Sequence, residues 1–257
     1  MTQAFAVPVE GGILQGEARG ESPALCFIHG MAGDRHDWQS LIAQLPPGLP
    51  LLTYDLRGFG DSTATEGVAF SHAADLLTLL DARGIERASL VGLSMGGGVA
   101  LNFALSHPDR VERLVLISPA MVGWEWSDEW KAIWRGVAQA ARAGDLPLAR
   151  ELWLAHPMFA AVLETPAGDE LRRSVANYHG RQWIKDDQRP EVPDIERLHL
   201  LRVPTLLLAG QRDAADMRLI ADVLASAAPD VKRVDFPAGH MLHLECPAEV
   251  ARAIGQF

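Results

Sequence analysis

The chain has 257 residues, of which 48% are hydrophobic and 22% are charged. These values are typical of a globular protein with one large core or two small ones. Its 23 basic and 33 acidic residues give a formal net charge of −10. Because the basic residues are scattered, the composition argues against nucleic acid or an anionic membrane as a partner.

The first ten residues, MTQAFAVPVE, lack the basic and apolar regions of a signal peptide. No apolar run approaches the roughly 18 residues that a membrane-spanning helix requires. We therefore expect a cytoplasmic protein. The two cysteines, Cys26 and Cys246, fit neither a disulfide framework nor a metal-ligand spacing, so two free thiols are expected.

Short apolar strands alternate with helix-length segments along most of the chain. The N-terminal residues predict an antiparallel hairpin around Gly11 and Gly12. Further strands are expected at 24–28, 50–54, 88–93, 111–117, 204–209 and 231–236. Helices are expected at 37–45, 71–83, 95–107, 214–227 and 247–255. This alternation predicts an α/β fold with a mostly parallel sheet flanked by helices on both faces.

Residues 119–195 break this rhythm and predict a helical cap inserted into a core made of 1–118 and 196–257. Six of the seven tryptophans lie in the insertion, and three of them recur at intervals of four, which places them on one helix face. These six are Trp124, Trp126, Trp130, Trp134, Trp153 and Trp183. Two interpretations stay open, because the indoles can form the core of a small helical layer or line an apolar substrate pocket.

The stretch SLVGLSMGGGVALNFAL contains the pattern G-x-S-x-G around Ser94, between an apolar strand and an apolar helix. Glycine in a helix interior costs about 1 kcal/mol relative to alanine, so the glycines at 96–98 need a reason. A sharp strand-turn-helix supplies one, because its flanking positions must lack side chains for strand and helix to approach. Ser94 is therefore the predicted nucleophile.

A serine hydroxyl needs a base and an acid that orients this base. His240, in the loop after the last predicted strand, is the leading base, and His243 is its competitor. The two histidines have no third ligand at a metal-like spacing, so no metal is expected. Asp213 follows the strand at 204–209 and is expected to accept a hydrogen bond from Nδ1 of His240, with Asp216 as the alternative.

The oxyanion needs two hydrogen-bond donors. The residue after the nucleophile, Met95, supplies one backbone N–H, and Met31 in the run CFIHGMAGD is expected to supply the other. His29 is interpreted as a brace for this loop. The charged, glycine-rich turn at 55–62 is expected to hold neighbouring loops together.

The motifs HGMAGD, YDLRGFGDS, GLSMGG, GQRD and AGHMLHLECP, in this order, resemble the α/β-hydrolase superfamily. The chain looks most similar to its small, single-cap carboxylesterases and enol-lactonases. The resemblance implies a sheet of the eight-stranded type with the cap inserted after the sixth strand. The resemblance favours His240 and Asp213 over His243 and Asp216. Because Ser94 is at the nucleophile position, the superfamily members whose nucleophile is an aspartate are excluded.

The predicted reaction is hydrolysis of a carboxylic ester or lactone through an acyl-enzyme, with a small, largely apolar or aromatic substrate and no cofactor. The expected substrate contacts are Trp126, Trp130, Trp134, Trp153, Trp183 and Met241. Alternatively, Arg135, Arg181 or Arg189 receives a substrate carboxylate.

Three other functions stay open at this point. Relatives that hydrolyse carbon-carbon bonds of vinylogous diketones share the triad, but many have Trp after the catalytic histidine, where this chain has Met241. Cofactor-free perhydrolysis or haloperoxidase activity uses the same triad as an esterase. A small-molecule receptor with vestigial hydrolysis is the third possibility. The sequence does not determine the natural substrate or the oligomeric state.

Overall fold

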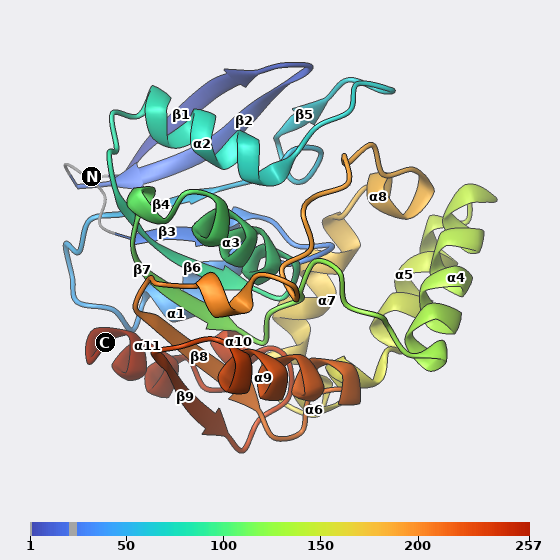
Figure 1. Ribbon diagram of the computed structural model, residues 1–257. Coiled ribbons are helices and arrows are strands. Elements are labelled where there is room, and N and C mark those ends of the chain that lie inside the picture. The colour runs from blue at the N-terminus through green and yellow to red at the C-terminus, as the bar shows by residue number, and fades with distance from the viewer. Residues whose placement is uncertain (1, 21–24) are drawn as a thin grey trace.

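The computed structural model describes residues 2–20 and 25–257. Figure 1 shows a twisted sheet flanked by helices, with a further group of helices beside one end of the sheet. The strands are β1 (Thr2–Val9), β2 (Gly12–Arg19), β3 (Leu25–Ile28), β4 (Leu51–Tyr54), β5 (Thr63–Ala64), β6 (Ala88–Leu93), β7 (Val111–Ile117), β8 (Thr205–Gly210) and β9 (Val231–Phe236). All predicted strands are confirmed, although residue 24 of the strand predicted at 24–28 lies outside the described residues.

Four of the five predicted helices lie close to their expected ranges, as α2, α3, α9 and α11, and the structure contains further helices, most of them in the insertion. The helices are η1 (Arg35–Trp38), α1 (Gln39–Ile42), α2 (His72–Ala82), α3 (Met95–Ser106), η2 (Pro108–Arg110), α4 (Asp128–Arg142), α5 (Leu146–Leu154), η3 (Pro157–Phe159), α6 (Ala160–Leu163), α7 (Gly168–Asn177), α8 (Arg181–Ile184), η4 (Leu198–Leu200), α9 (Ala215–Ala227), α10 (Leu242–Glu245) and α11 (Pro247–Gly255). The helix predicted at 37–45 is in fact the pair η1 and α1, because Asp34 caps the chain in a capping box and starts the turn earlier.

The strands form one sheet in the order β1-β2-β4-β3-β6-β7-β8-β9, with β5 paired to β2. β2 runs antiparallel to β1, β4 and β5, and every pair from β4 to β9 is parallel. The predicted α/β fold with a mostly parallel sheet is therefore confirmed. Among the described residues, eight strands remain when the two-residue β5 is set aside, and β7 is the sixth in chain order.

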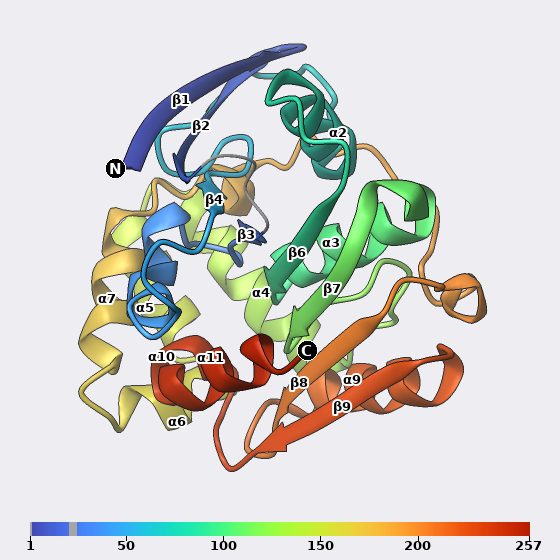
Figure 2. The same ribbon diagram turned by 90° about the vertical axis from the view of Figure 1, so that its left-hand side faces the viewer.

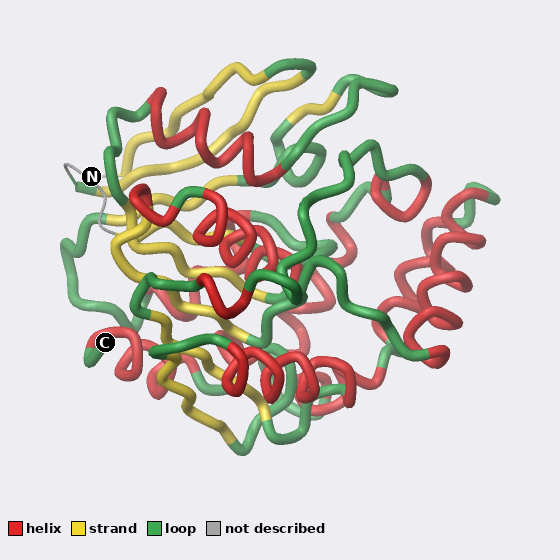
Figure 3. Tube along the Cα trace, viewed as in Figure 1, coloured by secondary structure: helices red, strands yellow, loops and turns green. Residues whose placement is uncertain are grey.

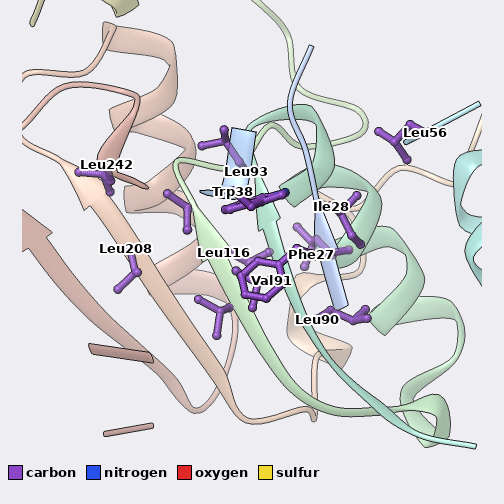
Figure 4. Packing of buried hydrophobic residues seen from close by; sticks show 14 of the residues in the cluster. Phe27, Ile28, Trp38, Leu56, Leu90, Val91, Leu93, Leu116, Leu208 and Leu242 are labelled. Atoms are coloured by element: carbon purple, nitrogen blue, oxygen red, sulfur yellow. The ribbon is translucent and has the colours of Figure 1, made fainter. Parts of the chain in front are cut away.

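Helices cover both faces of the sheet. Figure 2 shows α2, α3 and α9 on one face and α10 and α11 on the other, and α1 packs against α10 and α11. All six residues of β6 and of β8 are buried as a result. Figure 4 shows how the apolar side chains of neighbouring strands pack, among them Phe27 of β3, Val91 of β6 and Leu116 of β7. The sheet is thus a rigid platform whose strand ends can hold side chains in fixed positions.

The helical insertion lies between β7 and β8. The tube in Figure 3 passes through only helices and loops in this stretch, and Figure 1 places α4, α5, α7 and α8 together beside the sheet. The two ends of the insertion are joined, because Asp194 N–H donates to Val122 O at 2.9 Å and Val122 N–H donates to the Asp194 carboxylate at 3.2 Å. Asn102 of α3 fastens the same carboxylate to the core at 2.8 Å. The cap boundaries at 119 and 195 stay a prediction.

Among the described helices, none is both long enough and apolar enough to cross a lipid bilayer.

Candidate active site

Ser94 occupies a strained turn between β6 and α3. Its backbone has φ 52° and ψ −117°, a region that side-chain-bearing residues rarely adopt. The turn is held by its own backbone, since Ser94 N–H donates to Ile117 O at 3.0 Å and Ser94 O accepts from Gly98 N–H at 3.0 Å and Ala120 N–H at 2.8 Å. Main-chain bonds to the end of β7 and to α3 therefore fix the position of the hydroxyl.

The glycines around Ser94 are required by close packing. A Cβ on Gly92 would lie 2.7 Å from Gly97 Cα, and one on Gly96 would lie 2.6 Å from the Ile28 carbonyl carbon. A Cβ on Gly97 would lie 2.8 Å from Cβ of Pro119. The glycine run thus lets α3 start against the ends of β3 and β6, which is the role that the sequence predicts for it.

His240 and Asp213 come from two different loops and meet beside Ser94. Asp213 follows β8 and His240 follows β9, and the His240 Nδ1 and Asp213 Oδ2 atoms are 2.9 Å apart. The second oxygen of Asp213 accepts a hydrogen bond from Ala214 N–H at 2.7 Å. Because both side chains are only 2% exposed, this carboxylate is well placed to hold the tautomer whose Nε2 accepts a proton. Ser94 and His240 line one cavity.

Glu245 is a polar residue of the site that the sequence analysis did not identify. Its carboxylate accepts from Gly239 N–H at 2.8 Å and from Met241 N–H at 3.2 Å, and these are the two neighbours of His240. The carboxylate therefore fixes the loop that carries the histidine. The available signal was weak: an acidic residue five positions after the histidine, at the end of the short helix α10.

The two alternative candidates have other contacts. His243 is fully buried against Trp38, with ring centroids 5.2 Å apart, and burial lowers its pKa to about 3. Asp216 accepts hydrogen bonds from Ser127 Oγ at 2.6 Å and from Trp124 Nε1 at 3.2 Å. His243 is thus a core residue, and Asp216 ties the start of the cap to α9.

The expected oxyanion donors border the serine. Met31 and Met95 line a cavity together with Ser94, and within residues 2–20 and 25–257 neither backbone N–H donates to another protein group. His29 braces the first of these loops: its Nδ1 lies 2.8 Å from Gly30 O and its Nε2 accepts from Leu56 N–H at 3.0 Å. Burial lowers the pKa of His29, so the ring stays neutral and serves as a brace.

The turn at 55–62 holds neighbouring loops together, as its charges predict. The fully buried carboxylate of Asp55 accepts from Arg35 N–H at 2.7 Å and from Asp61 N–H at 2.9 Å, and it pairs with the Arg35 guanidinium. Arg57 forms a second, buried ion pair with Asp75 of α2. The loop after β4 is thereby fastened to the loop that follows β3.

Two cavities of very different size open beside Ser94. The narrow pocket has a volume of about 20 Å³ and is lined by Ser94, His240 and Met241, while the wide cleft measures about 470 Å³ and is lined by Ser94 and Met95. The wide cleft is further lined by Met31, Ala120, Trp126, Trp130, Lys131, Trp134, Arg135, Ala138, Arg142, Trp153, Met158 and Met217. The site therefore has a tight side next to the histidine and a roomy side under the cap.

The cap tryptophans form the wall of the wide cleft. Trp126 stacks on Trp130 with ring centroids 4.2 Å apart, and Trp134 meets Trp153 edge-on at 5.8 Å. All four line the cleft. The expectation for Trp183 needs correction: it is 1% exposed, lines neither cavity and packs against Trp153 and Tyr178 in the cap interior. Trp183 therefore belongs to the core of the cap, whereas the other four indoles line the cleft.

The narrow pocket carries one polar edge. The carboxylate of Asp37 and the hydroxyl of Ser174 line it, and Ser174 Oγ donates to Asp37 Oδ1 at 2.7 Å. Burial raises the pKa of Asp37 to about 7, although the hydrogen bond from Ser174 opposes this. Because Asp37 belongs to η1 and Ser174 to α7, this contact also joins core and cap beside the pocket.

The chain belongs to the α/β-hydrolase fold family, whose model matches residues 23–247. It is 31% identical to 2-succinyl-6-hydroxy-2,4-cyclohexadiene-1-carboxylate synthase of Enterobacter sp. (strain 638), over 95% of this chain and 96% of the relative. It is 29% identical to 3-oxoadipate enol-lactonase 1 of Acinetobacter baylyi, over 92% and 88% of the two chains. A thermophilic esterase from Thermogutta terrifontis has a similar structure, with a TM-score of 0.83, 27% identity, and 99% and 97% of the two chains covered.

Proposed function

We propose that the protein is a serine hydrolase that cleaves a carboxylic ester or lactone through an acyl-enzyme. The observation that carries the proposal is the meeting of the strained Ser94 turn with the buried His240–Asp213 pair at one cavity. A nucleophile, a base and an orienting acid that come together from three strand ends are typical of nucleophilic catalysis. The esterase and the enol-lactonase among the similar proteins support the same reaction class.

In the proposed mechanism, Ser94 Oγ attacks the ester carbonyl while His240 Nε2 accepts the serine proton. The N–H groups of Met31 and Met95 donate to the oxyanion of the tetrahedral intermediate. His240 then gives its proton to the leaving alkoxide, and the acyl group remains on the serine. A water molecule, deprotonated by His240, releases the acid and restores the free hydroxyl.

The two cavities suggest which side of the ester lies where. The leaving oxygen receives its proton from His240, and this residue lines the narrow pocket and not the wide cleft. The alcohol part would then occupy the narrow pocket and the acyl part the indole-lined cleft. We therefore expect a small alcohol and a large, largely apolar or aromatic acyl group. In a lactone, acyl and alcohol parts belong to one ring, and the ring oxygen would face His240.

Two ester series test this proposal. In one, methyl esters carry acyl groups from acetyl to naphthoyl; in the other, benzoate esters carry alcohols from methyl to butyl. We expect kcat/KM to rise or hold along the acyl series and to fall along the alcohol series. Ser94→Ala should lose at least about 10³-fold in kcat with every substrate. Repeated turnover by Ser94→Ala, or no turnover by the unaltered protein with any ester, would reject the proposal.

The first relative named above is a synthase, so a reaction without water is a second candidate. The two candidates differ in the fate of solvent oxygen. Ester hydrolysis through an acyl-enzyme places one oxygen atom of water in the released acid. A reaction that does not consume water places no solvent oxygen in its product. Turnover in ¹⁸O-water, followed by mass measurement of the acid, separates them.

A further inference from the structure

The charges in the wide cleft have one sign. Its ionisable lining residues are Lys131, Arg135 and Arg142, and none of the described residues that line it is acidic. The three lie on α4, at spacings of four and seven residues, and so share a helix face. The chain as a whole has a net charge of −10. The lining of the cleft beside the predicted nucleophile differs from this, because its ionisable residues are all basic. Cationic side chains on the wall of a cleft favour anionic ligands.

Arg135 is the cation of this set whose guanidinium is uncommitted. Lys131 is paired with Glu125, and Arg142 Nε donates to Ile184 O at 2.9 Å. Within the part of the chain that the structure describes, Arg135 makes no side-chain hydrogen bond and no ion pair at these bonding distances. Arg135 lines the wide cleft together with the four cap tryptophans.

The other arginines that the sequence offers as carboxylate ligands lie elsewhere. Arg181 is paired with Asp187 at 3.0 Å, and neither Arg181 nor Arg189 lines the narrow pocket or the wide cleft. The sequence does not distinguish these three arginines as carboxylate ligands. In the structure, Arg135 lines the cavity that Ser94 also lines.

We propose that Arg135 binds a carboxylate on the acyl group of the substrate, at the end remote from the ester carbonyl. The substrate class is then a monoester or lactone of an acid with a second, free carboxyl group. A guanidinium offers two parallel N–H donors that match the two carboxylate oxygens. The indoles around it remove water from an aromatic or apolar spacer between the two ends. This inference rests on the orientation given under the proposed function.

Binding to Ser94→Ala tests the inference without any turnover. The probes are monomethyl terephthalate and the monomethyl ester of biphenyl-4,4′-dicarboxylic acid, each compared by calorimetry with its neutral primary amide. We expect at least one anion to bind about tenfold or more tightly than its amide, as a charge-assisted hydrogen bond implies. Adding Arg135→Gln should abolish this preference, and raising the salt concentration should weaken it.

Arg173→Gln is the matched control. Arg173 is exposed on α7 of the cap and lines neither cavity, so its removal takes the same charge from the cap without touching the cleft. The control should keep the full preference for the anion. Equal binding of both anions and their amides, or a preference that survives Arg135→Gln, would overturn the inference.

Turnover by the protein with Ser94 intact provides the second readout. The ratio of kcat/KM for the anionic ester to kcat/KM for its amide should fall about tenfold in Arg135→Gln and stay constant in Arg173→Gln. If no ester is hydrolysed, the proposed function fails, while the binding experiment still decides whether Arg135 holds a carboxylate.

Discussion

The two halves of the site are built in different ways. The half at the strand ends consists of groups that the backbone or a buried partner fixes: the Ser94 turn, the His240–Asp213 pair and the braced loop before Met31. The cap half is a wall of side chains on α4, on α5 and on the segment just before α4, with the cations of α4 among them. The first half suits chemistry that requires one geometry, and the second suits recognition that differs from one substrate to another.

Asp213 and Asp216 give the strongest test of this division. They are only three positions apart in the sequence, yet the first belongs to the strand-end half and the second holds the cap. Asp213→Asn should lower kcat about 10⁴-fold, since the wrong histidine tautomer would face the serine. Asp216→Asn removes charge from the contacts to Ser127 and Trp124 and should change kcat much less. Steady-state kinetics on one ester, with thermal unfolding as a check of folding, measures both. Equal losses in the two variants would contradict the division.

Gly96 and Gly136 compare the halves through stability. Both are helical glycines, but a Cβ on Gly96 would lie 2.6 Å from the Ile28 carbonyl carbon, whereas one on Gly136 would meet its nearest neighbour at 3.9 Å. Gly96→Ala should lower the free energy of unfolding by about 3 kcal/mol. Gly136→Ala should raise it by up to about 1 kcal/mol. Urea denaturation gives both values, and a stable Gly96→Ala would show that the close approach at α3 is not needed.

His243 sharpens the comparison through pH. Burial lowers its pKa to about 3, from the usual 6.5, so the unfolded chain binds this proton first as the pH falls. Stability is therefore full above pH 6.5 and is lost toward pH 3, by about 2 kcal/mol between pH 6.5 and 5 for this group alone. His243→Leu should flatten the fall in stability over this window. Exposed His199 is the control, and His199→Leu should leave the profile unchanged; identical profiles in all three proteins would refute the assignment.

Substitution of Trp130 is expected to give the smallest effect, and it tests the cap half alone. Its indole stacks on Trp126 and lines the wide cleft. Trp130→Ala should raise KM for methyl naphthoate about tenfold, as is typical when a buried aromatic contact is removed, and should change KM for methyl acetate little. A similar rise for both esters would mean that the indole supports the fold and not the acyl group.

The strand-end half could be predicted from the sequence because local chemistry specifies it. A serine between glycines, after an apolar strand and before an apolar helix, is typical of a nucleophile turn. The loops that follow successive parallel strands converge at one sheet edge, so the base and the acid could be sought there.

The cap half could not be predicted to the same depth. Trp153 and Trp183 look alike in the sequence, yet one lines the cleft and the other lies behind it, since helix packing decides which face each indole presents. Glu245 in the strand-end half also escaped prediction, because its partners are backbone N–H groups, which leave no mark in the sequence.

The most direct test of the central claim is to ask which residue an active-site-directed reagent modifies. The protein is incubated with diethyl 4-nitrophenyl phosphate, and the position of the adduct is mapped by tandem mass spectrometry while ester hydrolysis is followed in the same sample. We expect one diethylphosphoryl group, on Ser94, formed in proportion to the loss of hydrolysis. Hydrolysis that persists with Ser94 fully modified, or inactivation with the adduct on another residue, would contradict the account.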